Sequence, residues 1–216
     1  MDLRSALQRL REPRKAWQAG SALLRGHYYR VKFRVLGRRV TIGRRFRVTG
    51  RLDIRGPGTV HFGDDCAVYS SRAAVTTPWT HTPEAVLRFG NRVLLTGTRI
   101  GCALRIDVDD WAGLADARIT DTDFHALEVY DQPRYNTSGA CKPVRIGRNA
   151  WIGAGAWVLK GVKVGENSVV GAAAVAVTDV PPNAVVMGNP ARVVWRLRGP
   201  KPAARPPEPD APGGAS

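Results

Sequence analysis

The chain has 216 residues, 44% of them hydrophobic, with 33 Lys or Arg, 18 Asp or Glu and a formal net charge of +15. This composition is sufficient for one globular domain with a buried core, and no segment reaches the roughly 18 uninterrupted apolar residues that span a bilayer. The charge is concentrated at the front, where residues 1–55 hold 16 Lys or Arg and only 3 acids. Because the first residues lack the apolar block of a signal peptide, we predict a cytoplasmic protein.

Residues 1–39 form a basic segment that we expect to be helical or extended. Apolar residues between Leu3 and Leu24 recur at roughly helical spacing among arginines, and Pro13 is expected to split or kink the segment. The simplest interpretation is a surface helix packed on the main domain. Peripheral contact with an anionic membrane is the alternative, and nucleic acid is not an expected partner.

Residues 40–198 carry a repeat of six residues. Aliphatic side chains recur at this period from Ile146 to Ala176, glycine follows one position later, and small or short side chains follow four positions later. The same period runs earlier, from Ile42, with several shifts of phase. Such a period fits a short parallel strand and a turn, with one aliphatic side chain pointing inward. We therefore predict an all-β solenoid, a parallel β-helix of six or seven triangular coils behind the short N-terminal helical segment.

Two interruptions of the repeat and the tail have a different composition. Residues 126–143 are too polar and turn-rich to join a coil, and we expect a loop there. Residues 73–86 are expected to form a second loop, either for acceptor binding or as an insertion tolerated at a corner. The tail 199–216 is rich in Pro, Ala and Gly without apolar periodicity, which predicts disorder.

The three cysteines give no sign of a disulfide or metal site. Cys66, Cys102 and Cys141 are odd in number, far apart, and lack the spacing of metal ligands. We predict reduced thiols and no bound metal.

Three stretches together resemble one known family. These are the repeat from Val144 to Val177, the closing segment VTDVPPNAVVMGNPARVVWRL and the stretch TDTDFH, which ends at His125. They resemble the hexapeptide-repeat acyltransferases, in particular the sugar O-acetyltransferase branch with the maltose and galactoside acetyltransferases. The resemblance implies a left-handed β-helix, a homotrimer with active sites in the grooves between subunits, and acetyl-CoA as acyl donor. Because noncatalytic scaffolds share the repeat, the functional prediction depends on the histidine.

His125 is the predicted catalytic residue, acting as general base. A sugar hydroxyl must lose its proton as it attacks a thioester, and neutral imidazole can accept that proton at cellular pH. Asp121, Asp123, Glu128 or a backbone carbonyl could orient the ring. Thr96 is a candidate to bind the oxyanion near the acceptor. The alternative for His125 is a structural histidine at a repeat boundary.

The resemblance assigns five residues to acyl-CoA: Trp151, Ala154, Ala172, Thr178 and Arg192. The two alanines are small enough for the pantetheine arm to approach closely, and Arg192 would meet the nucleotide phosphates. Trp151 is alternatively a corner or trimer contact. Thr178 stands where relatives commonly carry lysine, so Lys160 or Arg196 could replace that contact.

We predict from these features an acetyl-CoA-dependent O-acetyltransferase. Its acceptor would be a sugar hydroxyl of a cell-surface polysaccharide or glycolipid precursor, because the basic front would attract anionic glycans or lipid headgroups. The alternatives are a noncatalytic β-solenoid scaffold and a sugar N-acyltransferase. A zinc carbonic anhydrase with this fold would need a closely spaced histidine pair, which is missing.

Overall fold

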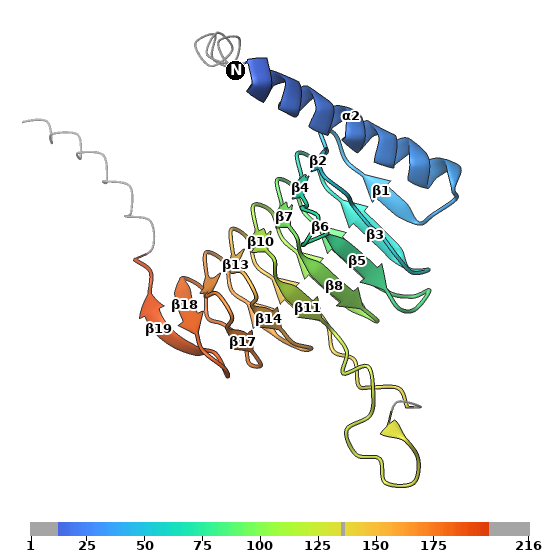
Figure 1. Ribbon diagram of the computed structural model, residues 1–216. Coiled ribbons are helices and arrows are strands. Elements are labelled where there is room, and N and C mark those ends of the chain that lie inside the picture. The colour runs from blue at the N-terminus through green and yellow to red at the C-terminus, as the bar shows by residue number, and fades with distance from the viewer. Residues whose placement is uncertain (1–12, 135–136, 199–216) are drawn as a thin grey trace, which may run out of the picture.

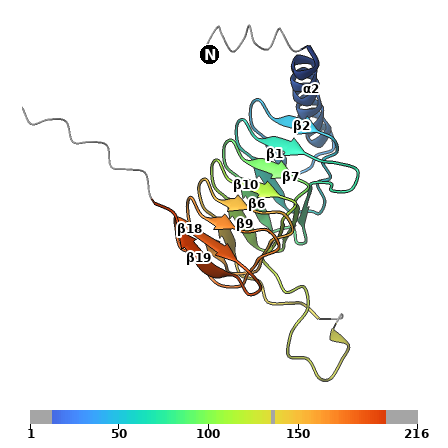
Figure 2. The same cartoon turned by 60° about the vertical axis from the view of Figure 1, so that its left-hand side comes forward.

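The computed structural model of the protein describes residues 13–134 and 137–198, so the predicted disordered tail lies outside the described residues. Three sheets of short strands form the sides of a triangular β-helix, and one helix, α2 (Pro13–Val35), lies across one end of it (Figures 1 and 2). The last strand, at the opposite end, pairs antiparallel with its neighbour; the other strand pairs are parallel.

Strands of successive coils lie next to one another in each of the three sheets. The six-stranded sheet contains, in spatial order, β1 (Val40–Ile42), β3 (Thr59–Phe62), β6 (Val86–Phe89), β9 (Arg105–Val108), β12 (Val144–Ile146) and β15 (Lys163–Val164). The eight-stranded sheet contains β2 (Arg47–Thr49), β4 (Ala67–Tyr69), β7 (Leu94–Thr96), β10 (Gly113–Ala115), β13 (Trp151–Ile152), β16 (Val169–Val170), β18 (Ala184–Met187) and β19 (Arg192–Arg196). The five-stranded sheet contains β5 (Thr77–Thr80), β8 (Arg99–Cys102), β11 (Arg118–Thr120), β14 (Trp157–Val158) and β17 (Val175–Ala176).

Each coil visits the six-, eight- and five-stranded sheets in that order. Isolated bridges at Leu52 and Arg55 complete the first coil, and a bridge at Val180 begins the last, which gives six coils and the start of a seventh. The aliphatic side chains of the six-residue repeat are buried, for example Ile146, Ile152 and Val158. Each one stacks on its counterpart in the next coil, so the period predicted the core correctly.

The predicted loop 73–86 is wrong in part, because the segment contains β5. Pro78 and Thr80 point inward, and the Thr80 hydroxyl accepts a hydrogen bond from the backbone N–H of Gly58 at 2.9 Å. A buried threonine with a local hydrogen-bond partner can occupy a core position at little cost. Since the inward residues are not aliphatic, the hydrophobic period does not reveal this strand.

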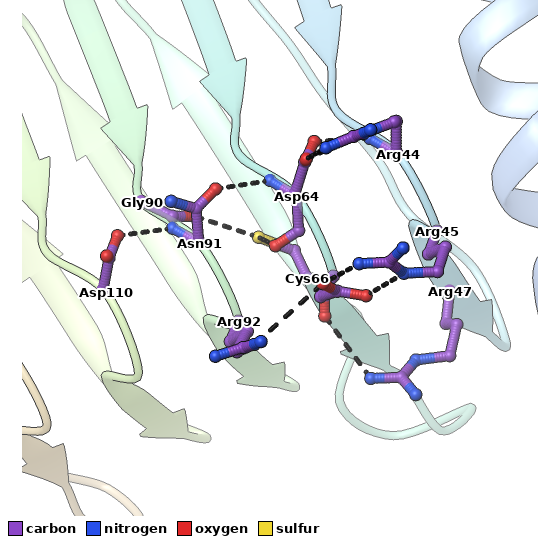
Figure 3. A network of polar contacts seen from close by, with 10 residues as sticks. Arg44, Arg45, Arg47, Asp64, Cys66, Gly90, Asn91, Arg92 and Asp110 are labelled. Carbon is purple, nitrogen blue, oxygen red and sulfur yellow. Dashed lines mark hydrogen bonds and ion pairs between the residues drawn. The ribbon is translucent and has the colours of Figure 1, made fainter. Parts of the chain in front are cut away.

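The corner between the six- and eight-stranded sheets, which we call the first corner, is held by a ladder of Asp and Asn side chains. The backbone N–H of Arg44 donates to Asp64, that of Asp64 to Asn91, and that of Asn91 to Asp110, at 2.7–2.8 Å (Figure 3). The bond from Arg44 is the main reason that the pKa of Asp64 is lowered. These bonds satisfy backbone donors where the chain leaves the sheet.

Helix α2 packs one face on the first coil and thereby closes the end of the core. Ala22, Gly26, Tyr29 and Phe33 are buried, and the Tyr29 hydroxyl accepts a hydrogen bond from the backbone N–H of Leu52 at 3.0 Å. Helix α2 runs over Pro13–Val35, and the expected split or kink at Pro13 depends on residues 1–12, which lie outside the described residues. Among the described residues, no helix is long and apolar enough to cross a membrane.

Two glycines of α2 provide a matched test of this packing. A Cβ on Gly26 would overlap the carbonyl oxygen of Phe46, whereas a Cβ on Gly20 would meet nothing within 4 Å. We expect Gly20→Ala to raise the free energy of unfolding by up to about 1 kcal/mol, through helix propensity. Gly26→Ala should lower it, because the helix must move off the first coil. Urea denaturation of both variants checks this, and equal effects would contradict the docking.

The three cysteines are free thiols, as predicted. Cys66 and Cys102 are buried and Cys141 is exposed. Burial raises the pKa of the Cys66 thiol to about 11 and also raises that of Cys102. Both buried thiols are therefore protonated at neutral pH and serve as small apolar side chains of the core.

Candidate active site

The chain leaves the coils after β11 and returns at β12, and this excursion projects from the body of the β-helix (Figure 1). Its two ends run side by side as an antiparallel stem. Thr122 and Cys141 form an antiparallel bridge. The backbone N–H of Asp123 donates to the carbonyl of Ala140 at 3.1 Å, and the backbone N–H of Lys142 donates to the backbone carbonyl of Asp121 at 2.9 Å. The stem holds His125 close to the third corner, between the five- and six-stranded sheets.

Asp121 anchors this stem to the coil below. Its carboxylate is fully buried and accepts hydrogen bonds from the backbone N–H groups of Ala103, Leu104 and Arg105, at 2.7, 2.8 and 2.6 Å. Three backbone donors around a buried carboxylate compensate its loss of hydration. Asp121, one of the predicted orienting residues, is therefore committed to the backbone and makes no hydrogen bond with the imidazole within the described residues.

His125 follows a tight turn with an unusual backbone conformation. Its N–H donates to the carbonyl of Asp123 at 2.8 Å, and Phe124, between them, has a φ of +63°. A three-residue turn through a left-handed aromatic residue is strained, and such strain gathers at functional sites. Gly139 packs against this turn, where a Cβ would lie 2.7 Å from the backbone nitrogens of Phe124 and His125.

The imidazole is exposed, and its Nδ1 lies 3.4 Å from the carbonyl oxygen of Thr137. A carbonyl can only accept, so this contact selects the tautomer with the proton on Nδ1 and leaves Nε2 as the basic nitrogen. The Thr137 hydroxyl accepts from the N–H of Ala126 at 2.8 Å and donates to the carbonyl of Arg134 at 2.6 Å. Among the described residues, the predicted orienting group that contacts the ring is a backbone carbonyl.

The other two predicted orienting acids lie elsewhere. The Asp123 carboxylate pairs with the Nζ of Lys160 at 3.3 Å, which ties the stem to the following coil at the third corner. Glu128 is exposed on the projecting part of the loop. Lys160, considered as a substitute for phosphate contact, is therefore engaged with Asp123.

A groove of about 800 Å³ crosses the outer face of the five-stranded sheet beside this turn. Its lining combines aromatic and guanidinium side chains: Trp79, Phe124, Trp157, Arg55, Arg72, Arg99 and Arg118. Arg55 lies over the ring of Trp79 at 5.8 Å, and Arg118 lies over that of Trp157 at 5.0 Å. No carboxylate lines the groove among the described residues, so it suits a ligand with a stacking face and negative charge.

His81 joins the groove to the histidine turn. Its ring lies 4.7 Å from Trp79 and meets Phe124 edge-on at 5.1 Å, and burial lowers its pKa. Phe124, the neighbour of His125 in the chain, is therefore a wall of the groove. These aromatic residues were not predicted from the sequence, where residues 73–86 were only a possible acceptor loop. The signal that could have found them is the tryptophan and histidine placed two residues apart at Trp79 and His81.

The residues predicted for acyl-CoA and the oxyanion lie apart from His125 in the same chain. Ala154 and Ala172 are exposed at the second corner, between the eight- and five-stranded sheets, and Thr96 is exposed at the end of β7 beside that corner. Thr178 is exposed at the third corner, and Arg192 is exposed on β19. One chain alone therefore does not unite the predicted donor residues with the histidine.

Trp151 also lies on the side of the eight-stranded sheet. Its ring covers Gly113 on the neighbouring strand β10, where a Cβ would overlap it, and the residue is 43% exposed. Its contacts fit an aromatic residue that stacks on the outer face of the sheet.

The fold and repeat define a class, the hexapeptide-repeat β-helix proteins. Residues 143–175 match the family model described as the hexapeptide repeat of succinyl-transferase. The fold is shared with an acetyltransferase from Vibrio cholerae, solved with acetyl-CoA, at 22% identity and a TM-score of 0.55, over 84% of this chain and 86% of that one. A galactoside acetyltransferase solved with coenzyme A gives 22% identity and a TM-score of 0.50, over 83% and 82%.

Curated relatives are similar over a shorter part of the chain. A putative acetyltransferase of Saccharomyces cerevisiae is 46% identical over 107 residues, which is 50% of each protein. A putative acetyltransferase of Staphylococcus aureus is 39% identical over 74 residues, 34% of this chain and 36% of that protein. The chain thus spans half or less of the length of these relatives. Residues 143–175 thus carry hexapeptide repeats, and the chain has the left-handed β-helix fold of these solved acetyltransferases, as the resemblance implied.

Proposed function

We propose that the protein transfers an acetyl group from acetyl-CoA to a hydroxyl of a sugar, with His125 as general base. The observation that carries this proposal is the groove of aromatic and guanidinium side chains that begins at Phe124, the residue before His125. The similarity to acetyltransferases supports the reaction type. The geometry supports the choice of base, because the Thr137 carbonyl favours the tautomer with a basic Nε2.

The chemical step needs one proton acceptor and no covalent enzyme intermediate. Nε2 of His125 takes the proton as the acceptor oxygen bonds to the thioester carbonyl carbon. When the carbon–sulfur bond breaks, the imidazolium returns that proton to the departing thiolate. Thr96 of a neighbouring subunit remains the candidate to bind the oxyanion.

The groove lining supports a proposal for the acceptor class. The faces of Trp79 and Trp157 can stack on a sugar ring, while Arg72, Arg99 and Arg118 can pair with phosphate or carboxylate groups. We therefore propose an anionic or phosphate-linked sugar, such as a precursor of a cell-surface polysaccharide or glycolipid. We propose a cytoplasmic location for the enzyme.

A homotrimer would complete the donor side. Ala154 and Ala172 lie at the second corner, and His125 lies near the third. When two subunits stand side by side, the groove between them can therefore contain the two alanines of one subunit and the histidine of the other. In that arrangement the small residues would admit the pantetheine arm, and Arg192 would meet the phosphates. Threefold symmetry closes such a head-to-tail contact.

The proposal is tested by thiol release from acetyl-CoA with neutral sugars, nucleotide-linked sugars and amino sugars as acceptors. We expect release that depends on a phosphate-linked sugar. Trp79→Ala should raise the KM for this acceptor roughly tenfold through lost stacking. Trp111→Ala is the matched control, since this tryptophan is also half-exposed beneath an arginine but lies at the first corner, and its KM should be unchanged.

Other outcomes of the same assay would change the assignment. Release with amino sugars alone would identify an N-acyltransferase. No release with any acceptor, together with no binding of CoA in calorimetry, would favour the noncatalytic scaffold.

A further inference from the structure

Helix α2 has a second apolar face that the fold leaves exposed. Trp17, Leu24, Tyr28, Val31 and Val35 are separated by seven, four, three and four residues, so they share one side of the helix. Between 46% and 79% of each residue is exposed. We call these five residues the α2 stripe. Their burial is not needed for the core, because the docked face is formed by Ala22, Gly26, Tyr29 and Phe33.

The stripe points away from the coils. Each docked residue comes two positions before a stripe residue, for example Ala22 before Leu24. Because residues two apart on a helix point to nearly opposite sides, the docked face and the stripe lie on opposite sides of α2. Figures 1 and 2 show α2 lying across the end of the stack, with β18 and β19 at the far end. The stripe therefore faces outward along the β-helix axis, where a flat surface could meet it without touching the coils.

Positive charge surrounds the stripe. The helix itself, residues 13–35, contains 6 Lys or Arg and no Asp or Glu. Of the arginines that follow it, Arg44, Arg45 and Arg51 already pair with acids of the coils. On the helix itself, Arg25 and Arg34 are exposed, and Lys32 is partly exposed. An exposed apolar stripe with tryptophan and tyrosine, bordered by Lys and Arg, is the pattern of helices that lie in the interface of an anionic bilayer.

The charge pattern also distinguishes between occupants. A second copy of the helix would bring arginines and lysines against one another, with no acid in residues 13–52 to pair them. Nucleic acid would satisfy the charges but would leave a Trp, Leu and Val surface against phosphates. Anionic lipid satisfies both, because acyl chains receive the apolar side chains and headgroups receive the cations.

We propose that the α2 stripe docks the protein on an anionic phospholipid surface, with the β-helix standing away from it. Docking is independent of acetyl transfer, because none of the five residues lines the groove or the histidine turn. It would hold the enzyme where a lipid-linked acceptor is presented.

The test is partition of the full chain onto phosphatidylcholine vesicles with and without phosphatidylserine, measured by flotation. We expect binding only with phosphatidylserine and weakening as salt is raised. Val31→Glu should lower the partition coefficient about tenfold or more, because it places a charge in the apolar stripe. Val194→Glu is the matched control: Val194 is 55% exposed but lies on β19, at the far end, and partition should be unchanged.

Leu24→Glu, at a residue 73% exposed, serves as a second variant, and thermal melting checks that all three remain folded. Val31→Glu and Leu24→Glu should retain acceptor-dependent thiol release, so failure to bind vesicles is distinguishable from failure of the proposed activity. The idea is overturned by absent binding to anionic vesicles, by equal binding of Val31→Glu and Val194→Glu, or by equal binding to neutral vesicles. Light scattering that showed the native chain to be larger than Val31→Glu, without vesicle binding, would assign the stripe to a contact between copies.

Discussion

Replacement of His125 by alanine is expected to lower kcat for acetyl transfer by about 10²- to 10⁴-fold, because the acceptor hydroxyl loses its proton acceptor. The KM for acetyl-CoA should change little, since the imidazole acts on the acceptor. Steady-state thiol release with the phosphate-linked sugar acceptor measures both constants. The same assay on His125→Gln separates loss of basicity from loss of volume, and we expect it to be as inactive as His125→Ala.

His61→Ala is the matched control for this prediction. His61 lies on β3 in the six-stranded sheet, and its Nδ1 is 2.6 Å from the Thr41 hydroxyl, away from the histidine turn. Its replacement should leave kcat within about twofold, as for surface changes without a site role. A His125→Ala enzyme that kept kcat within a few-fold of the native value would exclude the general-base role.

The second large effect is expected at Asp121, and it concerns stability. Asp121→Asn should lower the free energy of unfolding by about 2–4 kcal/mol. The amide has one acceptor oxygen in place of two, and its NH₂ group would face backbone N–H donors of residues 103–105. Urea denaturation measures the change. Because the stem positions His125, kcat should fall as well, even where the variant is still folded.

Asp107→Asn provides the comparison for the Asp121 prediction. Its carboxylate pairs with Arg105 at 2.6 Å on the surface of β9, where an ion pair contributes up to about 1 kcal/mol. We expect a change in unfolding free energy well below that of Asp121→Asn. Equal effects of the two substitutions would mean that the buried hydrogen bonds of Asp121 contribute no more to stability than a surface ion pair.

The buried charge of Asp121 also affects the pKa values of two neighbouring side chains. Burial, and then the charge of Asp121, raise the pKa of the Cys102 thiol, whose Sγ lies 3.5 Å from the carboxylate. The same charge opposes the effect of burial on the pKa of His81. Asp121 thus affects the pKa of His81 in the groove and holds the stem in place, although it does not line the groove.

The six-residue period was sufficient to predict the fold class. In a stack of coils every inward position contacts its own counterpart one coil away, so a local pattern carries the tertiary arrangement. Ile146, Ile152 and Val158 therefore appear in the core where the period places them. The strand β5 was missed for the same reason, because its inward residues, Pro78 and Thr80, depart from the aliphatic pattern.

The role of Asp121 was not predictable from the motif that contains it. In sequence, Asp121 and Asp123 stand equally close to His125, and either could orient the ring. Only the fold places Ala103, Leu104 and Arg105, at the preceding third corner, around the first carboxylate and Lys160, at the following one, beside the second. Contacts between coils depend on which residues stack, and most of one coil separates residues 103–105 from Asp121 along the chain.

The sequence by itself determined the repeat, its inward aliphatic residues, the excursion that carries His125 and the basic front of the protein, because each of these is a local pattern. Tertiary structure alone decided which side chains share a surface. It brought His81, which packs on Trp79, against Phe124 beside the histidine, and it turned one apolar face of α2 onto the coils and the other outward. The physical reason is that a groove or an exposed stripe is defined by neighbours from different coils, whose register is set by packing rather than by distance along the chain.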